Sequence, residues 1–335
     1  MKMIVSGYYI LFQVMKLLFK RRNNVSLSSV FVYFTLPFMT LFLQVQAGYT
    51  EDVIVVKTRS VPGGEQILDG FKSVCDSGIS IKEYDMKGRL NEGEKIIKEI
   101  KESIKLNPPK VVLTIGAPAT KLVQEAIKEI PILFSMVVNP HKKGFSGNNI
   151  SGITSDVPIR LQLDKLKTIV PSVESIGIIY NPKNTNNIIE EAKQVASDMG
   201  LKLVMYKVSS QKEVPRAIRD IIEEVNALLV ITDSTVVNKH SFKYIITTTL
   251  ENKIPTVTYT DYLVKAGFLF SLTPDYFSMG KQAGNIACKF QKDKPKKQPL
   301  IESPQVLKLA INLNTAKRIG LNISPDVLNS AIIYK

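Results

Sequence analysis

Residues 111–120 have the sequence VVLTIGAPAT, and residues 227–237 have the sequence ALLVITDSTVV. Each stretch begins as a short apolar run and continues into small and hydroxyl residues that are typical of a helix start. The helices that follow end at Glu129-Ile130-Pro131 and at Lys253-Ile254-Pro255, and each is followed by a new apolar run. The same strand–helix–strand unit occurs twice, which predicts two similar α/β lobes.

The rest of the chain continues this alternation on both sides of the two units. Short apolar runs alternate with stretches of helical period, as in parallel sheets that are covered by helices on both faces. We therefore predict an α/β fold with two Rossmann-like lobes. The predicted strands are Val53–Val56, Ile79–Glu83, Val111–Ile115, Ile132–Val138, Ile176–Tyr180, Leu203–Val208, Ala227–Thr232, Thr256–Tyr259, Phe268–Leu272 and Leu307–Ile311.

The lobes are predicted to be joined by several strands, with a ligand cleft between them. The segment NISGIT gives way to a new helix near residues 153–158, and a later helix returns to the first lobe near Pro274. The Lys/Pro-rich segment 294–299 is predicted to be a further crossing. These boundaries assign residues 48–155 and 274–294 to lobe 1, and residues 156–273 and 300–335 to lobe 2.

The first 47 residues have the features of a secretory signal. A basic stretch at 16–24 precedes a largely apolar stretch at 25–43, and Val45 and Ala47 place small residues at a signal-peptidase site. We predict a signal peptide over residues 1–47 and an exported, periplasmic protein. An uncleaved N-terminal anchor is the alternative, because the apolar stretch is long and Pro37 interrupts it.

Composition excludes several function classes. Two cysteines cannot form a disulfide framework or a four-ligand zinc site, and the two histidines lie about 100 residues apart. The net charge of +14 is spread out, apart from residues 1–47 and a lysine cluster at 289–297 that contains no arginine. Nucleic-acid binding favours arginine and aromatic residues interleaved on one surface, so we predict no nucleic-acid partner. Phosphate-binding and nucleophile-elbow motifs are absent from the sequence, and we expect no cofactor and no metal ion.

Candidate ligand-binding residues follow from the predicted strands. In open parallel sheets, ligands bind beyond the carboxyl ends of the strands, and two facing lobes bring those ends to one cleft. The residues that this rule selects are Ser60, Thr114, Gly116, Ala117, Ala119, Thr120, Asn139, Asn181, Asp233, Ser234, Thr235 and Tyr259.

Two of these assignments have structural alternatives. Residues 116–120 offer backbone N–H groups to a carboxylate or phosphate, or they simply begin a helix. Asp233 pairs with a ligand ammonium, or it caps a helix. The set contains hydroxyls, amides and tyrosine but no nucleophile–base pair, so it suits a small polar or zwitterionic ligand with an apolar or ring portion and predicts no enzyme.

The order and spacing of several segments resemble a known family. The segments are GAPAT (116–120), IPILFSMVVNP (130–140), GNNISGIT (147–154), IGIIYNP (176–182), DSTV (233–236), DYFSMGKQAGNIACKF (275–290) and INLNTAKRIGLNISPDVL (311–328). Together they are similar to the type I solute-binding proteins of ABC importers, in the subfamily that includes tryptophan- and tyrosine-type receptors. The resemblance covers residues 52–335.

The resemblance implies two lobes that close on a small solute, a membrane permease as partner, a monomer and no catalysis. The family's cleft positions fall at Ser60, 114–120, Asn139, Asn181, 233–235 and Tyr259. The sequence departs from the family at residues 141–146, a short segment that carries His141-Lys142-Lys143, and in the loop 59–64. Aromatic amino acids are therefore not assumed as the solute. A sensory receptor with the same cleft is the alternative function.

Overall fold

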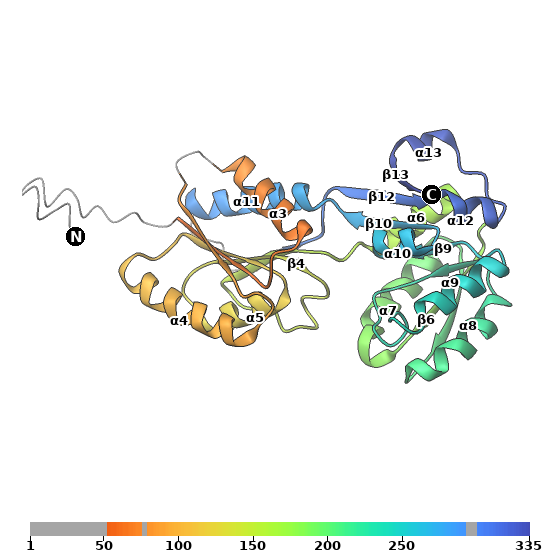
Figure 1. Ribbon diagram of the computed structural model, residues 1–335, viewed down its shortest axis with the longest axis horizontal. Helices are drawn as coiled ribbons and strands as arrows, with labels where there is room; N and C mark the ends of the chain where they lie inside the picture. The colour runs from red at the N-terminus through yellow and green to blue at the C-terminus, as the bar shows by residue number, and fades with distance from the viewer. Residues whose placement is uncertain (1–51, 76–78, 293–299) are drawn as a thin grey trace, which may run out of the picture. The chain divides into compact units, whose positions relative to one another are not determined.

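The computed structural model describes residues 52–75, 79–292 and 300–335 (Figure 1). The predicted signal peptide, residues 1–47, lies outside the described residues. Among the helices of the described part, none combines the length and apolar character that crossing a bilayer requires.

Six strands of the described residues form the first sheet. They are β1 (Val53–Lys57), β2 (Ile81–Asp85), β3 (Val111–Ile115), β4 (Ile132–Val137), β5 (Ile150–Thr154) and β11 (Ile301–Glu302). Their order across the sheet is β11-β5-β4-β3-β1-β2, and all the pairs are parallel. Every residue of β1, β3 and β5 is buried, which explains why β1 and β3 are largely apolar.

Helices cover both faces of this sheet, and sheet and helices together form lobe 1 (Figure 1). Alternate residues of β1 contact opposite helix layers: Ile54 packs with α4 and α5, and Val55 packs with α3 and α11. This alternation follows from the two-residue period of a strand. The helices are α3 (Pro62–Val74), α4 (Leu90–Leu106), α5 (Ala117–Ala126) and α11 (Tyr276–Lys292).

The second sheet contains seven strands within the described residues. They are β6 (Ser175–Tyr180), β7 (Lys202–Lys207), β8 (Ala227–Leu229), β9 (Thr256–Thr258), β10 (Phe270–Pro274), β12 (Leu307–Asn312) and β13 (Ala331–Tyr334). The order is β13-β12-β10-β9-β8-β6-β7. All pairs are parallel except β10 with β12, which is antiparallel.

Lobe 2 is this second sheet with the helices on its two faces. One core includes Leu163 and Ile189, on α6 and α7, and the other includes Ile218, Ile245 and Leu263, on α8, α9 and α10. The elements are α6 (Ile159–Ile169), α7 (Pro182–Asp198), the short 3-10 helix η1 (Gln211–Glu213), α8 (Val214–Ile222), α9 (Phe242–Glu251), α10 (Asp261–Ala266), α12 (Leu313–Arg318) and α13 (Pro325–Asn329). The predicted two-lobed α/β fold is confirmed.

Three segments connect the two sheets. Residues 155–158 lead from β5 to α6, Asp275 lies between β10 and α11, and residues 303–306 lead from β11 to β12. The third segment corrects the predicted crossing at 294–299: β11 pairs with β5, so residues 301–302 belong to the first sheet and the chain crosses after them. As domain limits, the predicted boundaries otherwise stay a prediction.

Glycines allow α3 and α11 to pack at very short distance. A Cβ atom at Gly280 would lie 2.0 Å from the carbonyl oxygen of Ile67, and one at Gly70 would lie 2.0 Å from that of Phe277. Only residues without a Cβ fit these two positions, since such atoms cannot approach so closely. This contact attaches α11 to lobe 1 after the chain leaves β10 of the second sheet.

Candidate functional site

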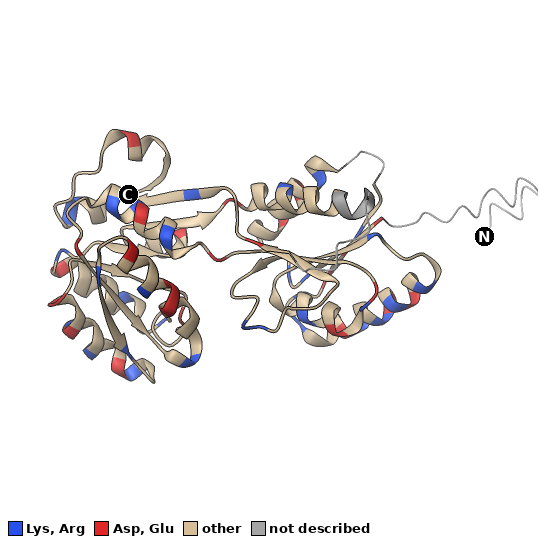
Figure 2. Cartoon of the chain, turned by 180° about the vertical axis from the view of Figure 1, so that it is seen from behind, with Lys and Arg blue, Asp and Glu red and all other residues tan. Residues whose placement is uncertain are grey.

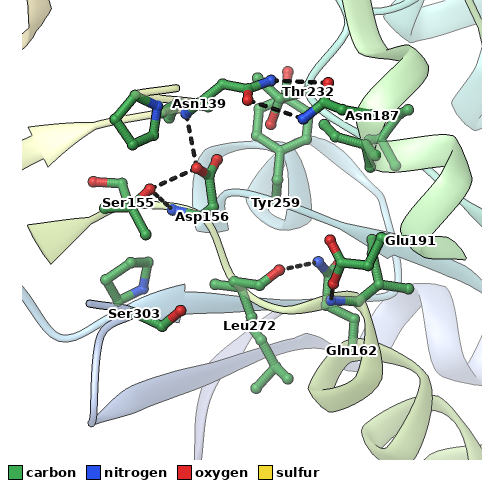
Figure 3. Close-up of a pocket in the computed structure, with 18 of the residues that line it drawn as sticks. Asn139, Ser155, Asp156, Gln162, Asn187, Glu191, Thr232, Tyr259, Leu272 and Ser303 are labelled. Atoms are coloured by element: carbon green, nitrogen blue, oxygen red, sulfur yellow. Dashed lines mark hydrogen bonds between the residues drawn. The ribbon is translucent and has the colours of Figure 1, made fainter. Parts of the chain in front are cut away.

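A cavity of about 440 Å³ lies where the connecting segments meet the two sheets (Figure 3). Its lining comes from both lobes, from the connections 155–158 and 303–306, and from Pro274 and Tyr276 on either side of Asp275. The lining residues are Val138, Asn139, Pro140, His141, Thr154, Ser155, Asp156, Val157, Ile159, Gln162, Asn187, Ile188, Glu191, Ile231, Thr232, Tyr259, Thr260, Leu272, Pro274, Tyr276, Ile301, Glu302 and Ser303.

An irregularity in β4 precedes the cavity segment 138–141. The register of β4 against β5 shifts between Phe134 and Val137, and Met136 has a φ of 58°. Asn139 follows with a φ of 55°, a left-handed conformation that asparagine tolerates better than most residues. Bulges of this kind commonly redirect side chains at functional sites, and here the irregularity lies directly before the chain reaches the cavity.

Asn139 connects the first lobe to the second at the cavity. Its backbone N–H donates to Asp156 Oδ2 over 2.7 Å. Its side-chain amide pairs reciprocally with that of Asn187 on α7, with N–O distances of 3.0 and 3.4 Å (Figure 3). Asp156 is fixed further by the Thr154 hydroxyl, which donates to the same Oδ2. The first connection and α7 are thereby tied to the segment that follows β4.

Helices α6 and α7 build part of the wall on the side of lobe 2. Glu191 Oε1, on α7, accepts from the backbone N–H of Ile159 at the start of α6 over 2.9 Å. Gln162 Nε2 donates to the carbonyl oxygen of Val157 over 2.8 Å. A carboxylate at a helix N-terminus satisfies an otherwise unpaired N–H group, so these bonds fix the start of α6 beside the connection.

Two half-buried tyrosines supply aromatic surface to the cavity. Tyr259 follows β9, and Tyr276 begins α11. Burial raises the pKa of Tyr259, and the charge of Asp233 raises it further. Burial also raises the pKa of Tyr276, together with the charge of Asp261. Both rings therefore present neutral phenols to the cavity at physiological pH.

Of the residues selected from the sequence, Asn139 and Tyr259 line this cavity. The predicted residues of β3 and α5 bond within lobe 1 instead. The Thr114 and Thr120 hydroxyls lie 2.9 Å apart, and the Ala119 N–H donates to Thr58 Oγ1. Gly116 is the N-cap of α5 with a φ of 94°, so residues 116–120 do begin a helix. Binding of a carboxylate or phosphate by their N–H groups stays a prediction.

Ser60 and Ala117 also lie outside this cavity. The exposed Ser60 donates from its hydroxyl to Asp85 Oδ2 over 2.8 Å. Ala117 contributes to a separate hollow of lobe 1, beside Leu90 and Phe145. Contact between these residues and a ligand stays a prediction.

Asp233 is almost completely buried and accepts four hydrogen bonds from its own lobe. Its Oδ2 accepts from the Asn181 N–H and the Thr185 hydroxyl, and its Oδ1 accepts from Asn184 Nδ2 and the Thr235 N–H. Asn181 caps α7 and donates from its side chain to Thr235 Oγ1. Asp233 thus joins the ends of β6 and β8, and Ser234 beside it is exposed.

Sequence reasoning missed the cavity residues on helix faces and on the connections. Asn187 and Glu191 lie on α7, four positions apart, which is the spacing of one helix face. Asp156 and Ser303 lie on the connecting segments. The return to lobe 1 that the sequence predicts near Pro274 was a signal for one connection, and Pro274 and Tyr276 there do line the cavity.

The arrangement suits binding of a small polar molecule. Amides, hydroxyls, carboxylates and tyrosines line the cavity, and they can orient a ligand by hydrogen bonds from two sides. No cluster of three or more His, Cys, Asp or Glu side chains able to hold a metal ion occurs within residues 52–75, 79–292 and 300–335.

Comparison with known proteins gives one family. The family model described as ABC transporter substrate binding protein matches residues 52–334. The tyrosine-binding protein of Clostridioides difficile (strain R20291) is 26% identical over 219 residues, which are 63% of each chain. The chain therefore spans 63% of the length of this curated relative.

Solved structures share the fold. The ligand-free, open structure of a substrate-binding protein with adhesive properties from Clostridium difficile has a TM-score of 0.72 at 21% identity, covering 84% of this chain and 98% of that one. An ABC domain from Streptococcus pneumonia in complex with L-Trp has a TM-score of 0.58 at 22% identity, covering 84% and 99%. At these identities the likeness shows the two-lobed fold alone.

Proposed function

Because the chain belongs to the family of ABC transporter substrate-binding proteins, we propose that it is an extracytoplasmic receptor that binds a small amino-acid-like solute for an ABC importer. The family name and the name of the curated relative are those of binding proteins, not of enzymes. The relative is named for binding tyrosine, which supports an amino-acid-like solute here. A membrane permease is the partner that this role requires.

The observation that carries the proposal is the cavity shared by the two lobes. Its walls come from separate sheets, and the segments that connect those sheets also line it. A solute that contacts both walls stabilises a closed arrangement of the lobes. The stabilisation equals the difference between the free energies with which the solute binds the closed and the open arrangement. Hinge closure at residues 155–158, 275 and 303–306 is therefore the proposed mechanism.

Asn139 and Tyr259 are the proposed ligand contacts that sequence and structure select together. Asn139 offers an amide at the boundary between the lobes, and Tyr259 offers a ring for the apolar part of a solute. The predicted signal peptide supports export. The role of the other predicted contacts, in lobe 1 and around Asp233, remains part of the proposal.

A thermal-shift screen of the purified full-length chain tests the proposal. The screen uses amino acids, nucleobases, sugars and small organic anions. A solute at 100 times its dissociation constant adds about 2.7 kcal/mol to the unfolding free energy, which raises the melting temperature measurably. We expect an amino-acid-like hit, and we expect Tyr259→Ala to abolish its shift.

The matched control is Tyr206→Ala, at a tyrosine on β7 that lies outside the cavity and bonds to Glu224. This variant should keep the full ligand-induced shift. A folded chain that responds to no solute of any class, or a hit whose shift survives Tyr259→Ala, would speak against the proposed site.

A further inference from the structure

The charged side chains that line the cavity are mostly of one sign. Asp156, Glu191 and Glu302 contribute three carboxylates. The lining contains one histidine, His141, and no lysine or arginine. The lining is therefore negative, in a chain whose net charge is +14.

One oxygen of each carboxylate accepts a hydrogen bond that orients the group, and the other oxygen is left for a ligand. Asp156 Oδ2 accepts from the Asn139 N–H over 2.7 Å, and Glu191 Oε1 accepts from the Ile159 N–H over 2.9 Å. Glu302 Oε2 accepts from Gln282 Nε2 over 2.6 Å. All three of these donors are neutral. Among the described residues, none of the three carboxylates forms an ion pair with lysine or arginine. Their second oxygens are acceptors held in position beside the cavity.

Basic residues close to the lining in the chain are engaged elsewhere. Lys142, next to His141, donates to the carbonyl oxygens of Lys183 and Asn184 at the start of α7. Arg160, next to Ile159, pairs with Asp164 over 3.6 Å, and Lys308 pairs with Asp275 over 2.6 Å. Figure 2 shows Lys and Arg distributed over the helices of both lobes with Asp and Glu among them. The cavity lining differs from this mixture, because it contains three carboxylates and no lysine or arginine.

Two further features of the lining suit a cation. The neutral rings of Tyr259 and Tyr276 can attract a positive group through their faces. The Ser155 hydroxyl, also in the lining, has a buried oxygen without a hydrogen-bond partner among the described residues. Carboxylates, aromatic faces and hydroxyl oxygens are the groups that stabilise an ammonium or guanidinium ion removed from water.

We propose that the solute of this cavity carries a net positive charge, as a basic amino acid or a small organic amine does. The inference rests on the proposed receptor function and specifies its substrate class. A neutral zwitterion such as tyrosine would leave most of the three carboxylates without a countercharge. Closure of the lobes would then bury uncompensated negative charge, which is costly.

Isothermal titration of the full-length chain with pairs of similar shape and different charge tests this inference. The pairs are arginine and citrulline, lysine and norleucine, and choline and 3,3-dimethylbutanol, with tyrosine and tryptophan as further probes. We expect the cationic member of at least one pair to bind about tenfold more tightly than its neutral partner, and high salt to reduce that ratio.

Glu191→Gln tests the carboxylates directly, because the glutamine oxygen can still accept from the Ile159 N–H. This variant should lower the cation preference by about threefold or more, and Asp156→Asn should do the same independently. The matched control is Glu190→Gln on the same helix, whose carboxylate is exposed and pairs with Lys193. It should leave the preference unchanged.

Tight binding of tyrosine, tryptophan or another neutral probe, with no preference for cations, would overturn the inference and leave the receptor function standing. An unchanged preference in both carboxylate variants would overturn it as well. A chain that binds no solute of any charge would contradict the receptor function itself.

Discussion

Among single residues, Asp233 shows how one carboxylate can organise the end of a sheet. Its four donors come from the loop after β6, the start of α7 and the loop after β8. Removal of the carboxylate leaves buried donors unsatisfied, and each one costs about 1–3 kcal/mol. We expect Asp233→Ala to lower the unfolding free energy by about 3 kcal/mol, measured by urea denaturation.

Ser234→Ala, at the exposed neighbouring position, is the control and should have little effect. The same variants separate the two roles that the sequence leaves open for Asp233. If Asp233→Ala weakened solute binding more than tenfold without loss of stability, the residue would be a ligand contact and the structural account of it would be wrong.

Asp275 makes a pH-dependent contribution at the second connection. Burial disfavours its charge, but the bonds from Lys308 and from the Ser278 N–H outweigh this, so the pKa of Asp275 is lowered. A carboxyl whose pKa is lower in the folded state stabilises the fold above its unfolded pKa, and this stabilisation is lost as the pH falls through the folded value. The loss is therefore expected below about pH 4.

Asp275→Asn should reduce stability at pH 6 and should lose less stability than the parent chain between pH 6 and pH 3. Urea denaturation at the two pH values measures both effects. Asp326→Asn, at an exposed position, serves as the comparison. An identical acid-induced loss in the parent chain and Asp275→Asn would show that this ion pair contributes nothing to the pH dependence.

At the scale of elements, the segment after β4 contacts α7 across the boundary of the two lobes. Lys142 donates to the carbonyl oxygens of Lys183 and Asn184, next to Thr185, whose backbone is not helical. Such a contact favours arrangements in which the lobes lie close together. We expect Lys142→Met to weaken solute affinity by about two- to fivefold, measured by calorimetry, because exposed charged contacts are worth little.

Lys143→Met is the matched control, since no bond from Lys143 to α7 occurs in the described structure. Its affinity should equal that of the parent chain. Equal losses in the two variants would indicate a general effect of charge on the rim rather than a contact between the lobes.

The packing of α3 on α11 depends on glycine. A methyl group at Gly280 would overlap the Ile67 carbonyl oxygen, so the helices would have to move apart. We expect Gly280→Ala to cost about 2 kcal/mol or more of unfolding free energy in urea denaturation. Gly64→Ala on α3 meets side-chain atoms only at 3.4 Å or beyond and should be neutral or stabilising. Equal stability of the two variants would refute this packing argument.

Elements with a strong local pattern could be predicted from the sequence. The fully buried strands β1 and β3 are largely apolar, and their position could be predicted closely. β11 has two residues, so its pairing with β5 rests on tertiary contacts rather than on a local pattern. That is why the crossing was expected seven to nine residues too early.

The candidate site was less predictable for a related reason. The rule that ligands bind beyond strand ends selects Asn139 and Tyr259, which line the cavity. It cannot select Asn187 or Glu191, because the face that α7 turns toward the cavity depends on how the helix packs. The rule also does not predict that the carboxylate oxygens of Asp233 accept hydrogen bonds from donors within lobe 2.

At the scale of the whole described chain, two similar lobes acquire a function by sharing one cavity. Neither sheet alone contains the lining: Asn139 and Glu302 belong to the first lobe, and Asn187 and Tyr259 to the second. Residues of the connections 155–158 and 303–306 also line the cavity. Under the proposed function, ligand contacts and hinge movement would therefore involve the same segments, which would couple solute binding to closure.

The most direct test of this account is a crystal structure of the chain with the solute that the thermal-shift screen selects. The account predicts solute density in the cavity, in contact with Asn139 and Tyr259 and with side chains from both lobes. Density confined to one lobe, or located away from the residues that line this cavity, would contradict the central claim that the shared cavity is the solute-binding site.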